Sequence, residues 1–249
     1  GIPEVAAGDD LGELVAAGLD RSGLQLLPGD IVVVSSKVVS KALGLVAASP
    51  DRAAVVAGET VRVVAERLSD GQVTQVVEST AGPVMAAAGV DASNVGDLDG
   101  VLLLPHDPDA VCRELRESLT RRTGVSPVGV ILSDTAGRPW RVGQTDFALG
   151  AAGVGVVDDL RGGLDADGRG LMVTARAVAD EIAASADLVK GKVARVPAAL
   201  VRGLGAQVTV EDGAGARSLV RTGAGDWFAL GSHEAVRAAL GVAPGTPRA

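Results

Sequence analysis

Short, continuous apolar runs constrain the fold of this chain more than any other feature. Three of them stand out, at residues 31–34, 101–104 and 128–132. Runs of this length, bounded by turn-forming or polar residues, are typical of strands buried within a sheet. Hydrophobic residues make up 47% of the 249-residue chain and aromatic residues only 2%, so we expect an aliphatic, closely packed core around these strands.

Helical patterns lie between the strands without a regular alternation. Asp107 and Pro108 predict a helix start, because aspartate is a good N-cap and proline suits the first turn, and Gly124 predicts the helix end. The intermixed elements indicate an α+β (mixed α/β) fold rather than a regular doubly wound sheet. Other expected helices cover residues 9–19, 52–68, 175–189 (capped by Thr174) and 233–240, and other expected strands cover residues 72–78 and 196–201.

Composition and charge exclude several classes of protein. A net charge of −8 and the shortage of aromatic residues disfavour a role in binding nucleic acid. A single cysteine, Cys112, leaves no partner for an intramolecular disulfide and too few ligands for a zinc finger or an iron–sulfur cluster. No apolar run approaches the roughly 18 residues of a membrane span, and no signal peptide is visible, so we expect a cytoplasmic protein.

The strongest chemical signal follows the third apolar run, where Asp134 and Thr135 end the predicted strand. Carboxylate and hydroxyl oxygens suit Mg²⁺ or Mn²⁺. Arg138 and Arg141 come next, and guanidinium groups bind phosphate or carboxylate oxygens bidentately. This combination is what phosphoryl transfer requires, although a turn-capping aspartate beside surface arginines explains it equally well. Residues 136–170 are rich in glycine and lack periodicity, which indicates a functional segment.

Weaker signals lie in three other segments. Asp91 and Asn94 belong to a tight loop, in which a second metal carboxylate and a base- or ribose-binding amide compete with an ordinary Asx turn, and the turn is the better explanation. Lys37 and Lys41 would share a helix face, either to bind polyphosphate or as a solvated helix start. Lysines at 190 and 192 end the helix predicted for 175–189, where they also complement the helix dipole. No Walker A or dinucleotide-binding glycine motif is present, so a nucleotide would be bound in another way.

Taken together and in order, these motifs resemble the coenzyme F-420:L-glutamate ligase family. The similarity covers nearly the whole chain, and it is strongest to the ligase domain of actinobacterial members. Those members continue into an FMN-binding, nitroreductase-like domain. The resemblance implies a ligase domain over residues 1–243 and a tail or linker over residues 244–249. The motifs that carry it are residues 1–5, 8–11, 36–41, 89–95, 133–146, 178–181 and 187–192.

The resemblance implies a GTP-dependent enzyme that adds L-glutamate to coenzyme F-420-0 and extends a γ-linked poly-glutamate tail through an acyl phosphate. It implies Mg²⁺ or Mn²⁺ as cofactor, with K⁺ as a further candidate, and an intertwined homodimer. The rival functions are a non-catalytic GTP-binding or scaffolding domain and a metal-dependent phosphohydrolase.

The resemblance also implies a role for individual residues. Archaeal members carry a glutamate metal ligand where this chain has Lys192. The implied metal ligands are Asp91, Asp134 and Thr135. The implied GTP contacts are Ile2, Pro3, Glu4, Val5, Ser36, Lys41, Asn94, Lys190, Gly191 and Lys192, with the segment up to Pro197. The catalytic residues expected from the phosphoryl-transfer chemistry described above are Asp134, Arg138 and Arg141.

Overall fold

The computed structural model describes residues 1–49, 51–69, 71–92 and 100–227. The chain divides into two units, Gly1–Leu219 and Val220–Ala249. The second unit contributes one described turn of 3₁₀ helix, Gly223–Gly225, and a contact of the Arg221 guanidinium with the Trp227 ring, 4.1 Å from its centroid. The helix expected at 233–240 and the boundary expected at residue 243 lie outside the described residues.

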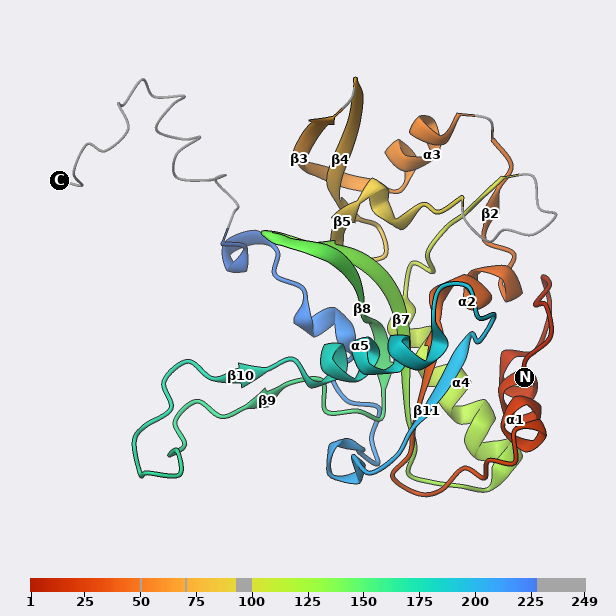
Figure 1. Cartoon of the computed structure of the whole chain (residues 1–249), viewed down its shortest axis with the longest axis vertical. Coiled ribbons are helices and arrows are strands. Elements are labelled where there is room, and N and C mark those ends of the chain that lie inside the picture. The colour runs from red at the N-terminus through yellow and green to blue at the C-terminus, as the bar shows by residue number, and fades with distance from the viewer. Residues whose placement is uncertain (50, 70, 93–99, 228–249) are drawn as a thin grey trace. The chain divides into compact units, whose positions relative to one another are not determined.

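A four-stranded sheet forms the centre of the first unit, in the order β11 (Ala198–Val201), β1 (Ile31–Ser35), β7 (Gly129–Arg138) and β8 (Arg141–Ala152) (Figure 1). Strands β1 and β7 run parallel, while the other two pairings are antiparallel. The sheet is therefore mixed, and together with the helices it confirms the expected mixed α and β architecture. Two of the three predicted apolar runs are the parallel central pair.

Helices cover both faces of this sheet, which explains why residues 31–34 and 129–132 of its central strands are apolar on both faces. Alternate side chains such as Val32 and Leu132 pack with α1 (Leu11–Arg21) and α4 (Pro108–Thr123). The intervening side chains, such as Val33 and Ile131, pack with α5 (Val178–Lys190) on the other face. All four of these strand side chains are at most 1% exposed.

The predicted limits of α4 are confirmed, and those of α5 are corrected. Asp107 accepts a hydrogen bond from the Ala110 N–H at 2.9 Å, and Gly124 ends α4 in the left-handed conformation with φ of 71°. Helix α5 instead begins at Val178, with Ala177 rather than Thr174 at its cap. The two residues after Thr174 are extended and form β10 (Ala175–Arg176), paired with β9 (Asp158–Asp159).

The helix expected over residues 52–68 is wrong in its second half. Helix α3 (Arg52–Gly58) ends early, and β3 (Thr60–Ser69) pairs with β4 (Gln72–Ser79), the strand that was predicted there. Threonine and valine at the start of β3 are β-branched and favour an extended backbone once a partner strand is present. A third strand, β5 (Val84–Ala86), completes this smaller sheet.

The region 136–170, which is rich in glycine and lacks periodicity, begins inside a long hairpin. Strands β7 and β8 continue to their tip, where Arg138 lies opposite Arg141. The inner part of β8 is rich in alanine and glycine, which do not favour strands, so the sequence pattern did not predict a strand there. Gly150 is required there because a side chain would come within 2.4 Å of the Pro108 carbonyl oxygen at the start of α4.

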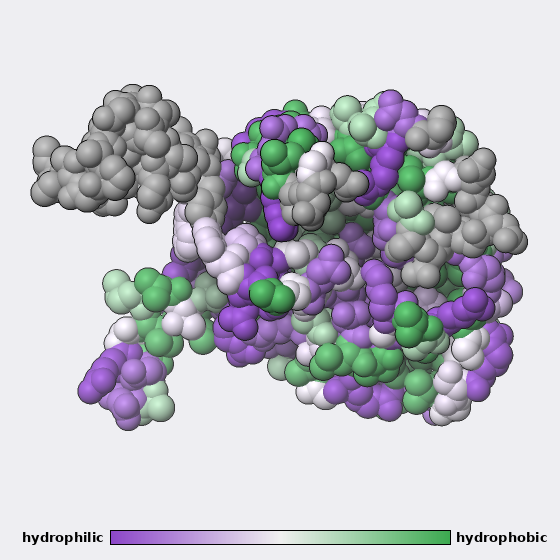
Figure 2. Space-filling view, turned by 45° about the horizontal axis from the view of Figure 1, so that its top comes forward, coloured by the Kyte–Doolittle hydropathy of each residue, from purple (hydrophilic) through white to green (hydrophobic). Residues whose placement is uncertain are grey.

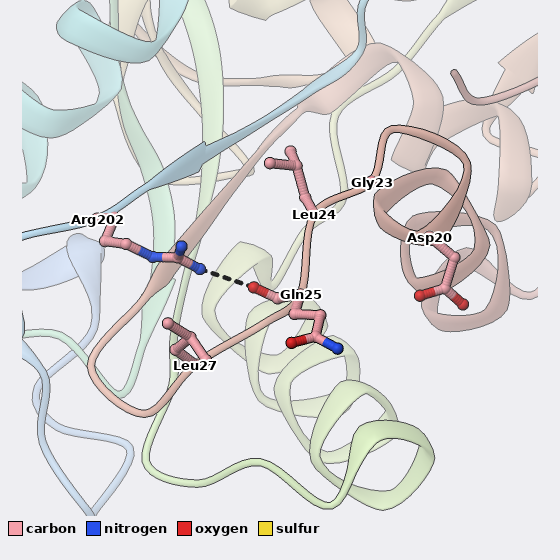
Figure 3. A pocket seen from close by; sticks show the side chains of 6 residues that line it. All are labelled: Asp20, Gly23, Leu24, Gln25, Leu27 and Arg202. Carbon is pink, nitrogen blue, oxygen red and sulfur yellow. Dashed lines mark hydrogen bonds between the residues drawn. The ribbon is translucent and has the colours of Figure 1, made fainter.

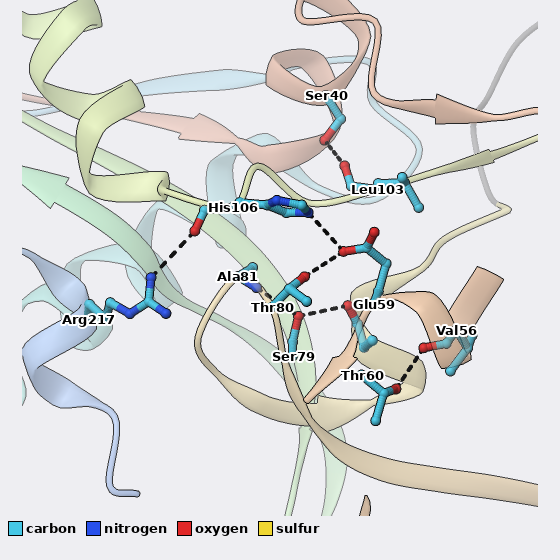
Figure 4. A network of polar contacts seen from close by, with 11 residues as sticks. Ser40, Val56, Glu59, Thr60, Ser79, Thr80, Ala81, Leu103, His106 and Arg217 are labelled. Atoms are coloured by element: carbon cyan, nitrogen blue, oxygen red, sulfur yellow. Dashed lines mark hydrogen bonds and ion pairs between the residues drawn. The ribbon is translucent and has the colours of Figure 1, made fainter. Parts of the chain in front are cut away.

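Polar contacts join the smaller sheet to the segment that leads into α4 (Figure 4). The Glu59 carboxylate accepts a hydrogen bond from the Thr80 hydroxyl at 2.5 Å and lies 3.1 Å from His106 Nε2. Nearby, the Ser40 hydroxyl donates to the Leu103 carbonyl at 2.6 Å. The remaining elements are α2 (Ser36–Ala42), β2 (Val46–Ala47), η1 (Ala87–Gly89), β6 (Val101–Leu102), η2 (Gly205–Gln207) and η3 (Ala216–Leu219).

Across the described ranges, no helix combines the length and the apolar character that crossing a membrane requires.

Candidate active site

Asp134 lies in β7 just beyond the point where its parallel pairing with β1 ends. Strand β1 passes directly into α2, and Ser36 at the start of α2 donates its hydroxyl proton to Asp134 Oδ1 at 2.8 Å. Ligand sites of sheets with parallel strands form at this carboxyl end, because the chain leaves the sheet there. The register places Ser35 opposite Ser133, so the Ser36–Asp134 contact follows directly from the pairing of the two strands.

The Asp134 carboxylate lies in a strongly acidic environment. Its pKa is raised to about 6, mainly by burial and also by the neighbouring carboxylates of Asp146 and Asp91, although the Ser36 hydroxyl and the Thr135 N–H stabilise the charged form. A carboxylate that is desolvated among other acids favours a cation, so this environment fits a hard divalent metal ion.

Asp91 lies on the same side of the sheet, in an ion pair with α2. Its Oδ2 is 2.6 Å from Lys37 Nζ, and the Asp91 side chain is 36% exposed. The backbone of Asp91 pairs with Leu102 in an isolated bridge, through hydrogen bonds of 3.1 and 2.8 Å. The rest of the loop in which an Asx turn competes with a metal site, from residue 93 on, lies outside the described residues. Asn94 lies outside the described residues.

A second ion pair joins the N-terminal segment to α2. Lys41 Nζ contacts Glu4 Oε1, and the Lys41 side chain is buried whereas that of Glu4 is exposed. The hydrogen bond and charge of Lys41 lower the pKa of Glu4. Val5 is buried, and Pro3 is exposed. The structure thus brings two predicted GTP-contacting segments together around Lys41.

Asp146 is a buried site residue that sequence reasoning did not single out. It lies directly opposite Thr135 across the β7–β8 hairpin. Its Oδ1 accepts the Thr135 hydroxyl at 2.7 Å, and its Oδ2 accepts the Ser133 hydroxyl at 2.8 Å and Lys190 Nζ at 2.7 Å. Burial alone would raise the pKa of Asp146, but Lys190, Thr135 and Ser133 together hold it below the ordinary value. The register of the β7–β8 hairpin, which the sequence pattern did not reveal, places Asp146 opposite Thr135.

The carboxylates of Asp134 and Asp146 lie on opposite faces of β7. Successive side chains of a strand alternate between its faces, so Asp134 points toward α2 while Ser133 and Thr135 point toward α5. The Thr135 hydroxyl therefore lies on the face away from the Asp134 carboxylate. Lys190, at the end of α5, reaches this second face, whereas Gly191 and Lys192 are exposed beyond the helix.

Arg138 and Arg141 lie at the exposed tip of the hairpin, away from the carboxylates. Arg138 is four residues beyond Asp134, or about 13 Å along the strand. Its guanidinium donates to the Val142 carbonyl at 3.3 Å. The catalytic role expected for both arginines stays a prediction.

A surface pocket of about 530 Å³ lies at the opposite end of β1 from Asp134 (Figure 3). Arg202 lines this pocket, and its guanidinium is committed to Asp30 at 2.8 and 2.7 Å and to the Gln25 carbonyl at 2.7 Å. The pocket does not touch the acidic residues of the candidate site.

A smaller cavity of about 110 Å³ lies between α1 and β11. Its walls are largely apolar and include Ile2, Val196 and Pro197, with Arg195 among them. It therefore joins the start of the chain to the segment after Lys192, both of which were predicted to contact GTP.

Comparison with known proteins identifies the family of the chain. The family model described as F420-0:Gamma-glutamyl ligase matches residues 1–203. The coenzyme F420:L-glutamate ligase of Haloarcula marismortui is 38% identical over 81% of this chain and 84% of its own length. The enzyme of the same name from Methanothermobacter thermautotrophicus is 38% identical over 82% and 86%, and that of Halobacterium salinarum is 39% identical over 77% and 79%.

These matches show that the chain is a ligase. It belongs to the F420-0:gamma-glutamyl ligase family, as the order of its motifs had indicated.

Proposed function

We propose that this protein is a GTP-dependent ligase that joins L-glutamate to coenzyme F-420-0 and then extends the γ-linked tail. The observation that carries the proposal is the pair Asp134 and Asp91, which lies at the carboxyl end of the parallel strands in a chain of this family. Lys37 of α2 is paired with Asp91, and Lys41, one helical turn further along α2, is paired with Glu4; both would supply positive charge for a polyphosphate.

The proposed reaction forms an amide in two transfers. An acceptor carboxylate is a poor electrophile, so one of its oxygens first attacks the γ-phosphorus of GTP, which gives an acyl phosphate and GDP. The glutamate amine then attacks the activated carbonyl carbon, inorganic phosphate leaves, and the amine loses a proton. Positioning and electrostatic stabilisation supply most of the catalysis in phosphoryl transfer.

The residues present fit Mg²⁺ or Mn²⁺ on the α2 face. Asp134 and Asp91 are hard oxygen donors, and their mutual repulsion is relieved when a cation lies between them. No three histidine, cysteine or acidic side chains converge as a metal cluster within the described ranges, so substrate oxygens would complete the coordination. A bound divalent ion would neutralise charge on the transferring phosphoryl group.

GTP is proposed to lie along α2 and the N-terminal segment. Ser36 and Lys41 face this region, and the small apolar cavity beside Ile2 supplies a surface for a planar base. Gly191 and Lys192 lie in the segment that follows α5 and leads to this cavity.

The test is a ligation assay. Protein is incubated with GTP, Mn²⁺, L-glutamate and F-420-0, and mass spectrometry is expected to show stepwise addition of glutamyl units with one GDP per unit. Asp20→Asn, an exposed change beside the pocket at the far end of β1, is the matched control and should retain full turnover.

The rival functions give different results in the same assay. Release of phosphate from GTP without any need for the acceptor would indicate a phosphohydrolase. Tight GTP binding without turnover, under varied metal and pH, would indicate a non-catalytic binding domain. Either result would refute the proposed ligase activity.

A further inference from the structure

The Lys190 ammonium lies in a cluster of oxygens on the α5 face of β7. It donates to Ser133 Oγ at 2.5 Å and to Asp146 Oδ2 at 2.7 Å. The Lys190 and Asp146 side chains are each 4% exposed. An ammonium at these distances occupies the position that a metal ion takes in an oxygen-lined site.

Both carboxylate oxygens of Asp146 accept hydrogen bonds within this cluster. One carboxylate oxygen accepts the Thr135 hydroxyl, and the other accepts both Ser133 and Lys190. The charge of Asp146 is therefore balanced from within the chain by Lys190. On the opposite face, Asp134 accepts a hydrogen bond from the neutral Ser36 hydroxyl, and Lys37 of α2 is paired with Asp91. The same strand end thus presents two acidic centres with opposite needs for an external cation.

We infer that Lys190 is a built-in cation for the Asp146 centre, so that the chain recruits a divalent ion only on the Asp134 face of β7. This inference deepens the proposed function, since it assigns the charge balance of the two faces. Lys192 is exposed beyond the helix end, so Lys190 rather than Lys192 supplies the internal charge.

If the ammonium is removed and its aliphatic stem is kept, as in Lys190→Met, Asp146 is left as a buried, uncompensated charge among hydroxyl groups. That centre should then bind an external cation. If Asp146 is neutralised as well, the need for a cation should disappear.

The experiment is carried out in an Asp134→Asn background, which silences the proposed cation site on the α2 face. Mn²⁺ binding is counted by electron paramagnetic resonance of the free ion, and thermal unfolding is followed with and without Mn²⁺. We expect no bound Mn²⁺ per chain for Asp134→Asn alone and one for Asp134→Asn/Lys190→Met, with a higher unfolding temperature when the ion is present.

Two further variants serve as controls. Adding Asp146→Asn to the Lys190→Met variant should abolish Mn²⁺ binding again. Lys190→Arg, which keeps the charge, should bind no Mn²⁺ in the Asp134→Asn background. The inference is overturned if the Lys190→Met variant folds without gaining a cation site, if it gains one that survives Asp146→Asn, or if it fails to fold at every Mn²⁺ concentration.

The proposed function and this inference fail in different ways. Wild-type protein that binds no Mn²⁺, or that binds it as well after Asp134→Asn, would refute the cation site on the α2 face. In that case the wild-type background replaces the Asp134→Asn background for the Lys190 comparison, and Mn²⁺ counts are read as differences between variants.

Discussion

The surroundings of Asp134 disfavour the charged form of its carboxyl group. Its pKa of about 6 lies above the value of 3.8 for an aspartate in the unfolded chain, because burial and two neighbouring acids disfavour the charge. At neutral pH the metal-free fold therefore loses at most about 3 kcal/mol of stability to this one group. Such a cost at a single residue is typical of functional sites.

Asp134→Asn should remove ligase activity and Mn²⁺ binding and still raise the thermal stability of the metal-free protein. The amide keeps the shape of the side chain, can still accept from Ser36, and carries no charge to desolvate. Calorimetry of metal-free protein and the ligation assay measure the two effects. Near-normal turnover in a folded Asp134→Asn protein would show that the site is misassigned.

The pH dependence of this stability difference has a definite sign. A carboxyl whose folded pKa is raised contributes stability below its unfolded pKa and loses that contribution as pH rises through the folded value. The gap in unfolding temperature between Asp134→Asn and wild type should therefore be smallest near pH 4 and reach a plateau above pH of about 7, beyond the folded pKa of about 6. A gap that stays constant across this range would exclude the assigned pKa.

At the scale of elements, the end of α5 is decided by one glycine. Lys190 turns inward to Asp146 and Ser133, and the chain then leaves the helix at Gly191 with φ of 61° and ψ of 158°. This region of backbone space is essentially restricted to glycine. The Gly191 conformation therefore allows Lys190 to be buried while Lys192 is exposed.

Gly191→Ala should destabilise the fold by about 1–3 kcal/mol, because alanine is strained in this conformation even though its side chain has space. Gly58→Ala is the matched control. Gly58 lies exposed at the end of α3 with nothing within 4 Å of the added carbon, so alanine should leave stability unchanged or raise it slightly. Denaturant unfolding compares the two, and equal effects at both positions would contradict the assigned backbone strain.

At the scale of the molecule, a hairpin arm built on β9 and β10 projects from the first unit (Figure 1). Figure 2 shows apolar side chains along this arm and hydrophilic ones at its end. Leu164, Met172 and Val173 are 70%, 79% and 87% exposed. A two-stranded hairpin with its apolar side chains in water is marginally stable on its own. We therefore propose that the arm packs on a second copy of the chain in the expected homodimer.

Met172→Lys/Val173→Lys should convert the dimer to a monomer, because two charges cannot be buried in an apolar interface without partners. Light scattering after size exclusion should give about twice the chain mass of 24.8 kDa for wild type and the single mass for the variant. Leu68→Lys, an equally exposed position on β3, is the control and should remain dimeric. A monomeric wild type, or a dimeric arm variant, would exclude this interface.

The sequence by itself determined the local parts of this protein. The apolar runs at 31–34 and 128–132 became the parallel central strands, and Asp107, Pro108 and Gly124 set the limits of α4. These features depend on burial of continuous apolar segments and on caps within a few residues, so they can be read without the fold. The ordered motifs likewise identified the family that the comparisons show.

Only the tertiary structure decided which polar groups meet. Thr135 and Asp146 are eleven residues apart and become partners through the register of a hairpin that the sequence did not predict. Lys190 joins them from another element, and strand alternation separates this cluster from Asp134, although the two lie on the same strand end. Pairing of this kind depends on register and on packing between distant segments. The sequence therefore indicated that acids and cations lie near one strand, but not which cation pairs with which acid.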